Sequence, residues 1–305
     1  VLYVLNDIPL NMTEKFFKII EYISIFEAIT IFLSVAIPGL MPQKFGFLYR
    51  QLVIDTMNKE LSRGIYSGFI GEKATAAYLL NLGLAYTLSQ LNDYRQINKN
   101  KLLVSLVLLI AILFTGKRLL LLTAIIMFVI CLLRGQSTEK KIKAVMIIIV
   151  SIIGIFCLVK FIPAAGITFD RFMLVDSYES MNGREDMWSK AIQIFENHKM
   201  LGCGYGSYQK ISGSIYNAHN SYLQLLAEIG VVGCIMLGII LVSTIYYALL
   251  NIRKKKNTMN YLAINLLIIT LLYAYTGNVF HTANQLITFF IAISIVQNSD
   301  QINIE

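Results

Sequence analysis

One histidine stands where a polar segment enters a long apolar run, and this is a position from which an imidazole can transfer protons. His219 and Asn220 open the run, and nine residues separate Asn220 from Gly230, with Gly233 three positions further on. An imidazole titrates near neutral pH and can take a proton from a hydroxyl group. A membrane surface partly shields such a site from water, which favours this chemistry. The alternative interpretation is an interfacial histidine at an ordinary helix start.

Several cations lie where they can bind an anion. Lys117 and Arg118 interrupt an apolar run, and cations at membrane depth usually have a partner or a task. Arg184 lies near the predicted start of a surface helix, where the helix dipole disfavours a cation unless an anion offsets it. A guanidinium suits bidentate contact with phosphate oxygens. The simpler interpretations are snorkelling to lipid phosphate for Lys117 and Arg118, and a solvated side chain for Arg184.

The composition indicates an all-α polytopic membrane protein. Of the 305 residues, 56% are hydrophobic and only 14% are charged, whereas soluble domains carry about 25% charged residues. The net charge of +8 comes mainly from short loops between apolar runs, so we expect no nucleic-acid partner. The four cysteines form neither a disulfide framework nor a metal site, and we expect no metal or other cofactor. The missing initiator Met and the interrupted first apolar run predict that N-terminal helices are missing from this chain.

About eight transmembrane helices are predicted, with one long external loop. The apolar run at residues 102–133 exceeds the roughly 20 residues that cross a bilayer, so two short spans should meet near Gly116. We divide the chain into N-terminal helices (1–162), the external loop (163–218) and C-terminal helices (219–305), all within one membrane domain. The predicted spans are residues 19–37, 69–91, the two halves of 102–133, 143–162, 220–250, 259–276 and 283–297.

The loop charges orient these spans. Loops 91–101, 134–143 and 251–257 are short and rich in Lys and Arg, so they should be cytoplasmic. The turn at Arg118 and the long loop 163–218 then face outward. Within this loop, apolar residues at helical spacing after Asn182 predict an amphipathic helix on the membrane face.

The residues also resemble a known family. The spacing of His219, Asn220, Gly230 and Gly233 is similar to the signature of the O-antigen ligase and O-antigen polymerase superfamily. Lys117 departs from the serine often found before the junction arginine, and Lys199 from a proline that often follows the surface helix. The resemblance covers roughly residues 68–250. Further matching features are the outer-turn Arg118, Arg171, the spacing of Arg184 and Trp188, and the glycines Gly202, Gly204 and Gly206.

The resemblance implies transfer of glycans carried on undecaprenyl diphosphate. The enzyme would be a multi-pass protein of the bacterial cytoplasmic membrane with an outward-facing site, displacing the diphosphate at the anomeric carbon without a metal. His219 would activate the acceptor hydroxyl. The implied partners are the lipid-linked glycan, an acceptor glycan or lipid, membrane lipids and other polysaccharide-assembly proteins. Arg118, Arg184 and Arg171 would bind the diphosphate, and Asn220, Lys117, Trp188 and Tyr205 would support the site or contact sugar.

Several functions stay open at this point. We favour polymerisation of lipid-linked repeat units, and the alternative within the family is ligase-like transfer to another acceptor. A polysaccharide flippase or transporter would explain the cations and the spans, but not a long outer loop that ends in His219. A non-enzymatic membrane scaffold is the remaining interpretation.

Overall fold

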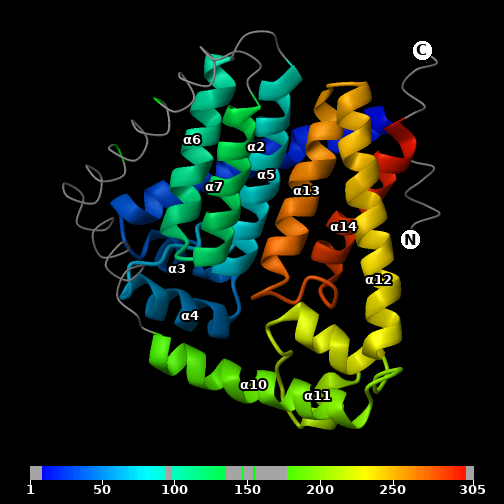
Figure 1. Ribbon diagram of the computed structural model, residues 1–305. Helices are drawn as coiled ribbons and strands as arrows, with labels where there is room; N and C mark the ends of the chain where they lie inside the picture. Colours follow the sequence, from blue (N-terminus) through cyan, green and yellow to red (C-terminus); the bar gives the residue numbers. More distant parts are fainter. Residues whose placement is uncertain (1–8, 94–97, 135–145, 147–153, 155–176, 300–305) are drawn as a thin grey trace. The chain divides into compact units, whose positions relative to one another are not determined.

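The computed structural model of the protein describes residues 9–93, 98–134, 146, 154 and 177–299, without the side chains of residues 92, 93 and 177–183. Every regular element in these residues is a helix, so the predicted all-α class is confirmed (Figure 1). The chain divides into two compact units, Leu10–Val175 and Asp176–Glu305 with Val1–Pro9. The number of eight spans stays a prediction, and the span predicted at residues 143–162 lies outside the described residues apart from two single positions.

Four long helices form the core of the Leu10–Val175 unit. Two of these helices, the one that carries Ser24 and the one that carries Gly83, pack closely together. A Cβ atom at Gly83 would lie 2.3 Å from Ser24 Oγ. Small residues of this kind let two helix backbones approach each other. The Ser24 hydroxyl also donates to the Leu79 carbonyl at 3.0 Å. The helices bounded within the described residues of this unit are α2 (Leu10–Ala36), α3 (Leu40–Lys44), η1 (Gly46–Leu48), α4 (Gln51–Leu61), α5 (Lys73–Asp93), α6 (Lys99–Phe114) and α7 (Arg118–Leu133).

The predicted break within residues 102–133 is confirmed. Helix α6 ends at Phe114 and α7 begins at Arg118, with Gly116 at φ +66° between them. A positive φ just past a helix end is the position that glycine occupies most readily. The Lys117 backbone N–H donates to Thr115 Oγ1 at 3.4 Å, and Arg118 is exposed in the first turn of α7.

Two predicted helix starts were wrong. Helix α2 begins at Leu10 rather than at residue 19, because its polar first turns are mostly exposed and contain neither Gly nor Pro. The helix in the long loop, α10 (Ser177–Asn197), begins five residues before the expected cap at Asn182. Polar residues that resemble a cap can equally continue a helix, and sequence alone does not separate the two cases.

The second unit is built around one long apolar helix. Helix α12 (Ser221–Lys254) is interrupted at Gly230, where the backbone has φ 63° and ψ −170°. Helices α2 and α12 are long and apolar enough to cross a membrane, and α7, α13 and α14 are shorter apolar helices. The other helices in the described residues of this unit are α10, α11 (Tyr208–Ser212), α13 (Thr258–Tyr273) and α14 (Ala283–Asn298).

Candidate functional site

The interruption of α12 at Gly230 joins this helix to the preceding glycine-rich segment. Backbone groups beside the interruption lack their helical partners, and residues 199–204 supply replacements. The four hydrogen bonds run from Val231 N–H to Lys199 O (2.9 Å), Val232 N–H to Met200 O (3.1 Å), Cys203 N–H to Ala227 O (3.0 Å) and Gly204 N–H to Glu228 O (2.8 Å).

Two glycines allow this close approach. A Cβ atom on Gly202 would lie 2.3 Å from the Glu228 carbonyl carbon, and one on Gly230 would lie 2.5 Å from the Gly202 nitrogen. Both residues also have positive φ angles, which disfavour any side chain. Gly202 and Gly230 are therefore needed for packing of backbone against backbone.

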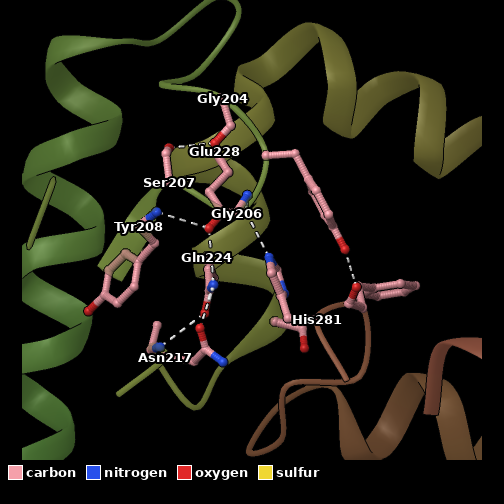
Figure 2. Close-up of polar contacts among 12 residues, drawn as sticks. Gly204, Gly206, Ser207, Tyr208, Asn217, Gln224, Glu228 and His281 are labelled. Carbon is pink, nitrogen blue, oxygen red and sulfur yellow. Dashed lines mark hydrogen bonds and ion pairs between the residues drawn. The ribbon is translucent and has the colours of Figure 1, made fainter. Parts of the chain in front are cut away.

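The side chain of Glu228 lies at the centre of a buried polar cluster (Figure 2). Its Oε2 atom accepts hydrogen bonds from the Gly206 N–H at 2.8 Å and from His281 Nε2 at 2.7 Å. Its Oε1 atom accepts from the Tyr208 N–H at 3.2 Å and from Gln224 Nε2 at 3.0 Å. We call these five residues the Glu228 cluster. A buried carboxylate needs such donors, and here both of its oxygens have two.

Gln224 connects the Glu228 cluster to the residues directly before His219. Its Nε2 donates to Asn217 Oδ1 at 3.1 Å, and its Oε1 accepts from the Ala218 N–H at 3.0 Å. The indole Nε1 of Trp188 donates to the Ala218 carbonyl at 3.0 Å. Both backbone groups of Ala218 are thus held by side chains. This fixes the approach of the chain to His219.

His219 has an unusual backbone and lies against another turn. It is the only non-glycine residue with positive φ in the described part of the chain, at 51°, a conformation that costs about 1–2 kcal/mol for a residue with a Cβ atom. Its half-buried ring places Nδ1 3.5 Å from Asn278 Nδ2. Asn220 caps α12, because its Oδ1 accepts from the N–H groups of Tyr222 and Leu223, both at 3.1 Å.

The turn between α13 and α14 carries both Asn278 and His281. It is tied to the start of α12, since the Ser221 N–H donates to the Ala274 carbonyl and the Ser221 hydroxyl to the Gly277 carbonyl, both at 2.8 Å. The position of this turn is therefore coupled to the position of His219.

Tyr205 covers one face of the His281 ring. The two rings stack with centroids 5.0 Å apart and planes 15° apart, and the Tyr205 hydroxyl donates to the Phe280 carbonyl. Partial burial raises the pKa of Tyr205, and the charge of Glu228 raises it further. The phenol thus stays protonated and keeps its donor.

The structure brings part of the predicted site together. His219, Asn220, Trp188 and Tyr205 all lie in the second unit, on segments that contact the Glu228 cluster. Arg184 is half-buried on α10, about one helical turn before Trp188. The argument from the helix dipole was wrong for Arg184, since α10 begins at Ser177 and Arg184 falls beyond its first turn.

The structure does not place the other predicted cations relative to the Glu228 cluster. Lys117 and Arg118 belong to the other unit, where they form the turn between α6 and α7. Arg171 lies outside the described residues. Among the described residues, no three His, Cys, Asp or Glu side chains gather as metal ligands would.

Sequence reasoning missed Glu228 and His281. The one local signal was a glutamate within an apolar run, which usually marks a functional or paired residue. Nothing in the sequence indicated that its partner would be a histidine 53 positions later.

A comparison with protein families identifies part of the chain. Residues 103–238 match the family described as O-antigen ligase. This segment belongs to the O-antigen ligase family. The resemblance drawn from the spacing of His219 and Gly230 is thereby confirmed, whereas Asn278 and His281 lie beyond the matched residues.

The match over residues 103–238 supports a broad class for this segment. The family comprises glycosyltransferase-like enzymes that act on lipid-linked glycans. Together with the apolar helices, the match supports an integral membrane protein. No curated protein matches the chain closely enough to add a relative by name.

Proposed function

We propose that the protein polymerises oligosaccharide repeat units carried on undecaprenyl diphosphate, at the outer face of the bacterial cytoplasmic membrane. The observation that carries this proposal is the position of His219. Within a segment of the O-antigen ligase family, this histidine stands at the start of a membrane-capable helix and is held by neighbouring side chains. A sugar hydroxyl is a poor nucleophile at neutral pH and needs a base held in this way.

The chemistry is a displacement at the anomeric carbon of the donor. The acceptor hydroxyl loses its proton to the His219 imidazole as its oxygen forms the new bond to that carbon. The bond from the carbon to the diphosphate oxygen breaks, and its electron pair leaves with undecaprenyl diphosphate. Arg184 and Arg118, together with Arg171, are proposed to bind the diphosphate, because guanidinium groups stabilise the charge that gathers on it.

In this proposal, arginine side chains supply the positive charge that stabilises the leaving diphosphate, and no metal ion is needed. Activity should therefore survive chelation of divalent cations. Purified protein in liposomes, given the flipped lipid-linked repeat unit, should make longer lipid-linked glycans in the presence of EDTA. Loss of product with EDTA, restored by a divalent cation, would contradict the metal-independent mechanism.

The same reconstitution separates the alternative functions. A polymerase lengthens glycan on the carrier lipid without a second acceptor. A ligase forms product only when a separate acceptor lipid, protein or wall polymer is added. A flippase moves the donor across the bilayer and forms no glycosidic bond. Transfer of single repeat units to the separate acceptor, with no lengthening of glycan on the carrier lipid, would contradict our proposal and favour the ligase.

The proposed orientation is tested by chemical labelling. Ile215, which is 86% exposed, lies in the loop that should face outward, and Lys256 in a loop that should be cytoplasmic. In a variant without the native cysteines, Ile215→Cys should react with an impermeant thiol reagent in intact cells. Lys256→Cys should react only after permeabilisation. The reverse pattern would place the site on the cytoplasmic side and remove the proposed donor.

A further inference from the structure

The pair of Glu228 and His281 is the most enclosed ionisable pair described in the second unit. The Glu228 side chain is 0% exposed and that of His281 is 6% exposed, with 2.7 Å between Oε2 and Nε2. The other ring nitrogen of His281, Nδ1, is buried without a hydrogen-bond partner among the described residues. A proton on Nδ1 would be a buried donor with no acceptor, which is costly. Because a carboxylate can only accept, the proton of this contact lies on Nε2 and is donated to Glu228.

Two separate chains of contacts lead from this pair to His219. The first runs from Glu228 to Gln224 and on to Ala218, whose backbone N–H is held at 3.0 Å immediately before His219. The second runs from Glu228 to His281 and through its turn to Asn278, whose Nδ2 lies 3.5 Å from the His219 ring. The first chain of contacts restrains the backbone next to His219, and the second reaches its imidazole ring.

A third chain of contacts reaches the helix that carries Arg184. Glu228 accepts from the Tyr208 N–H, and the Tyr208 hydroxyl donates to the Met187 carbonyl of α10 at 2.7 Å. The Tyr208 side chain is buried with Ala191 and Ile194 of α10. The proposed base and a proposed diphosphate ligand are therefore fixed to the same carboxylate.

We infer that Glu228 and His281 are positioning residues for glycan transfer. They hold His219 in its strained backbone conformation and α10 at the orientation that presents Arg184. This inference rests on the proposed function, because it assigns the pair a task in that reaction. His281 does not take the substrate proton itself, since Nε2 faces Glu228 and Nδ1 is enclosed by protein.

Two substitutions of His281 separate positioning from direct proton transfer. His281→Ala removes the donor to Glu228 and the ring beneath Tyr205, and should lower kcat by about 10²-fold, the loss that a misplaced catalytic group produces. His281→Gln restores an N–H near the position of Nε2 but cannot accept a proton. It should recover most of the lost kcat and leave the pH profile of the reaction unchanged. His198→Gln, at the exposed histidine directly after α10, is the matched control.

Glu228→Gln tests the centre of the cluster. The amide keeps the shape of the side chain but turns an NH₂ group toward two of the four donors. We expect kcat to fall by about 10²-fold, with a much smaller change in the KM for the lipid-linked donor. Hydrogen exchange at the Gly206 and Tyr208 amides should become at least about tenfold faster, because each loses a charge-assisted hydrogen bond.

The outcomes distinguish this inference from the proposed function. If His281→Gln were as inactive as His281→Ala while remaining folded, His281 would be the proton acceptor and the positioning role would be overturned. Wild-type kcat in Glu228→Gln, despite faster exchange at Gly206, would overturn it as well. Activity retained in His219→Ala would instead overturn the proposed function, and the exchange result would still report on the Glu228 cluster.

Discussion

Both units of the protein contain buried glutamates, and Glu21 in the first and Glu228 in the second are satisfied in different ways. Glu21 in α2 is 3% exposed and binds the Lys101 ammonium of α6, at 2.8 Å from both oxygens, and the Thr87 hydroxyl of α5. Glu228 binds two backbone N–H groups, an amide and an imidazole, and no Lys or Arg among its recorded partners in the described residues. A lysine neutralises Glu21 and joins three helices. The donors to Glu228 come from the segment of Gly206 and Tyr208, from Gln224 of α12 and from His281 in the turn before α14, so the carboxylate joins three segments that are distant in sequence.

From this difference we expect Glu21 to contribute mainly to the free energy of unfolding. We expect Glu228 to contribute mainly to the geometry of the proposed site. A lysine on a flexible stem tolerates small shifts of its partner, whereas backbone amides hold a carboxylate in one orientation. Within the second unit, the segments around Glu228 carry His219 and Arg184, the proposed base and one proposed diphosphate ligand. The predictions below test this contrast.

The largest expected effect is at His219. His219→Ala should lower glycan transfer by about 10²–10⁴-fold, the contribution of a positioned general base. Its thermal unfolding should stay close to wild type, because the substitution removes a half-buried ring at a strained position. Glycan chain length is measured on equally expressed, purified variants with lipid-linked donor, and His198→Ala is the control. If more than about a tenth of the activity remained, His219 would not be the base.

Lys101 should show the opposite pattern. Lys101→Met keeps the length of the side chain but leaves Glu21 buried without its cation, which costs about 3 kcal/mol of unfolding free energy. Activity for each folded molecule should be unchanged. Thermal unfolding in detergent measures the loss, and Lys99→Met, at an exposed position of the same helix, is the control. Loss of activity without loss of stability would place the Glu21 pair in the catalytic machinery.

Substitution of the proposed diphosphate ligands should lower activity, as expected for His219, rather than stability, as expected for Lys101. Arg184→Ala and Arg118→Ala should each reduce kcat/KM by about 10²-fold, since one donor to a developing oxyanion contributes about 3 kcal/mol. Arg→Lys at either position should recover only part of this, because the bidentate geometry is lost. Arg63→Ala, at an exposed arginine, is the control. Wild-type turnover in both Ala variants would mean that these two side chains only contact lipid or water.

Sequence predicted the features that depend on local pattern. The break before Arg118 followed from an apolar run too long for one crossing, and the family signature identified His219. The starts of α2 and α10 were missed, because polar residues can continue a helix as well as cap it. The Glu228 cluster could not be predicted, since its members come from three segments that only tertiary packing brings together.

The glycines before His219 also show that sequence does not predict contacts made by tertiary packing. In the sequence, Gly202, Gly204 and Gly206 were recognisable only as features of the family resemblance. The structure gives Gly202 another constraint, contact with the backbone at Glu228, which no local pattern of residues 202–206 contains.

The smallest predicted effect tests whether the interruption of α12 is required for the Glu228 cluster. Gly230 has φ 63° and ψ −170°, a combination that essentially only glycine adopts, and its replacement by a residue with a side chain costs about 1–3 kcal/mol. In Gly230→Ala the new methyl group would also meet the Met200 carbonyl oxygen at 2.5 Å, so the segment that ends in Gly206 must shift. Activity should fall together with stability, because that segment donates to Glu228.

Gly238→Ala is the matched control for this substitution. Gly238 lies later in the same helix with no atom within 4 Å of the added Cβ, so the change should be neutral or stabilise the helix by up to about 1 kcal/mol. Thermal unfolding and glycan transfer are measured for both variants. If Gly230→Ala matched Gly238→Ala in both measurements, α12 could run straight through this position. The backbone pairing with residues 199–204 would then be unnecessary for the site, and the contrast between Glu228 and Glu21 would lose its structural basis.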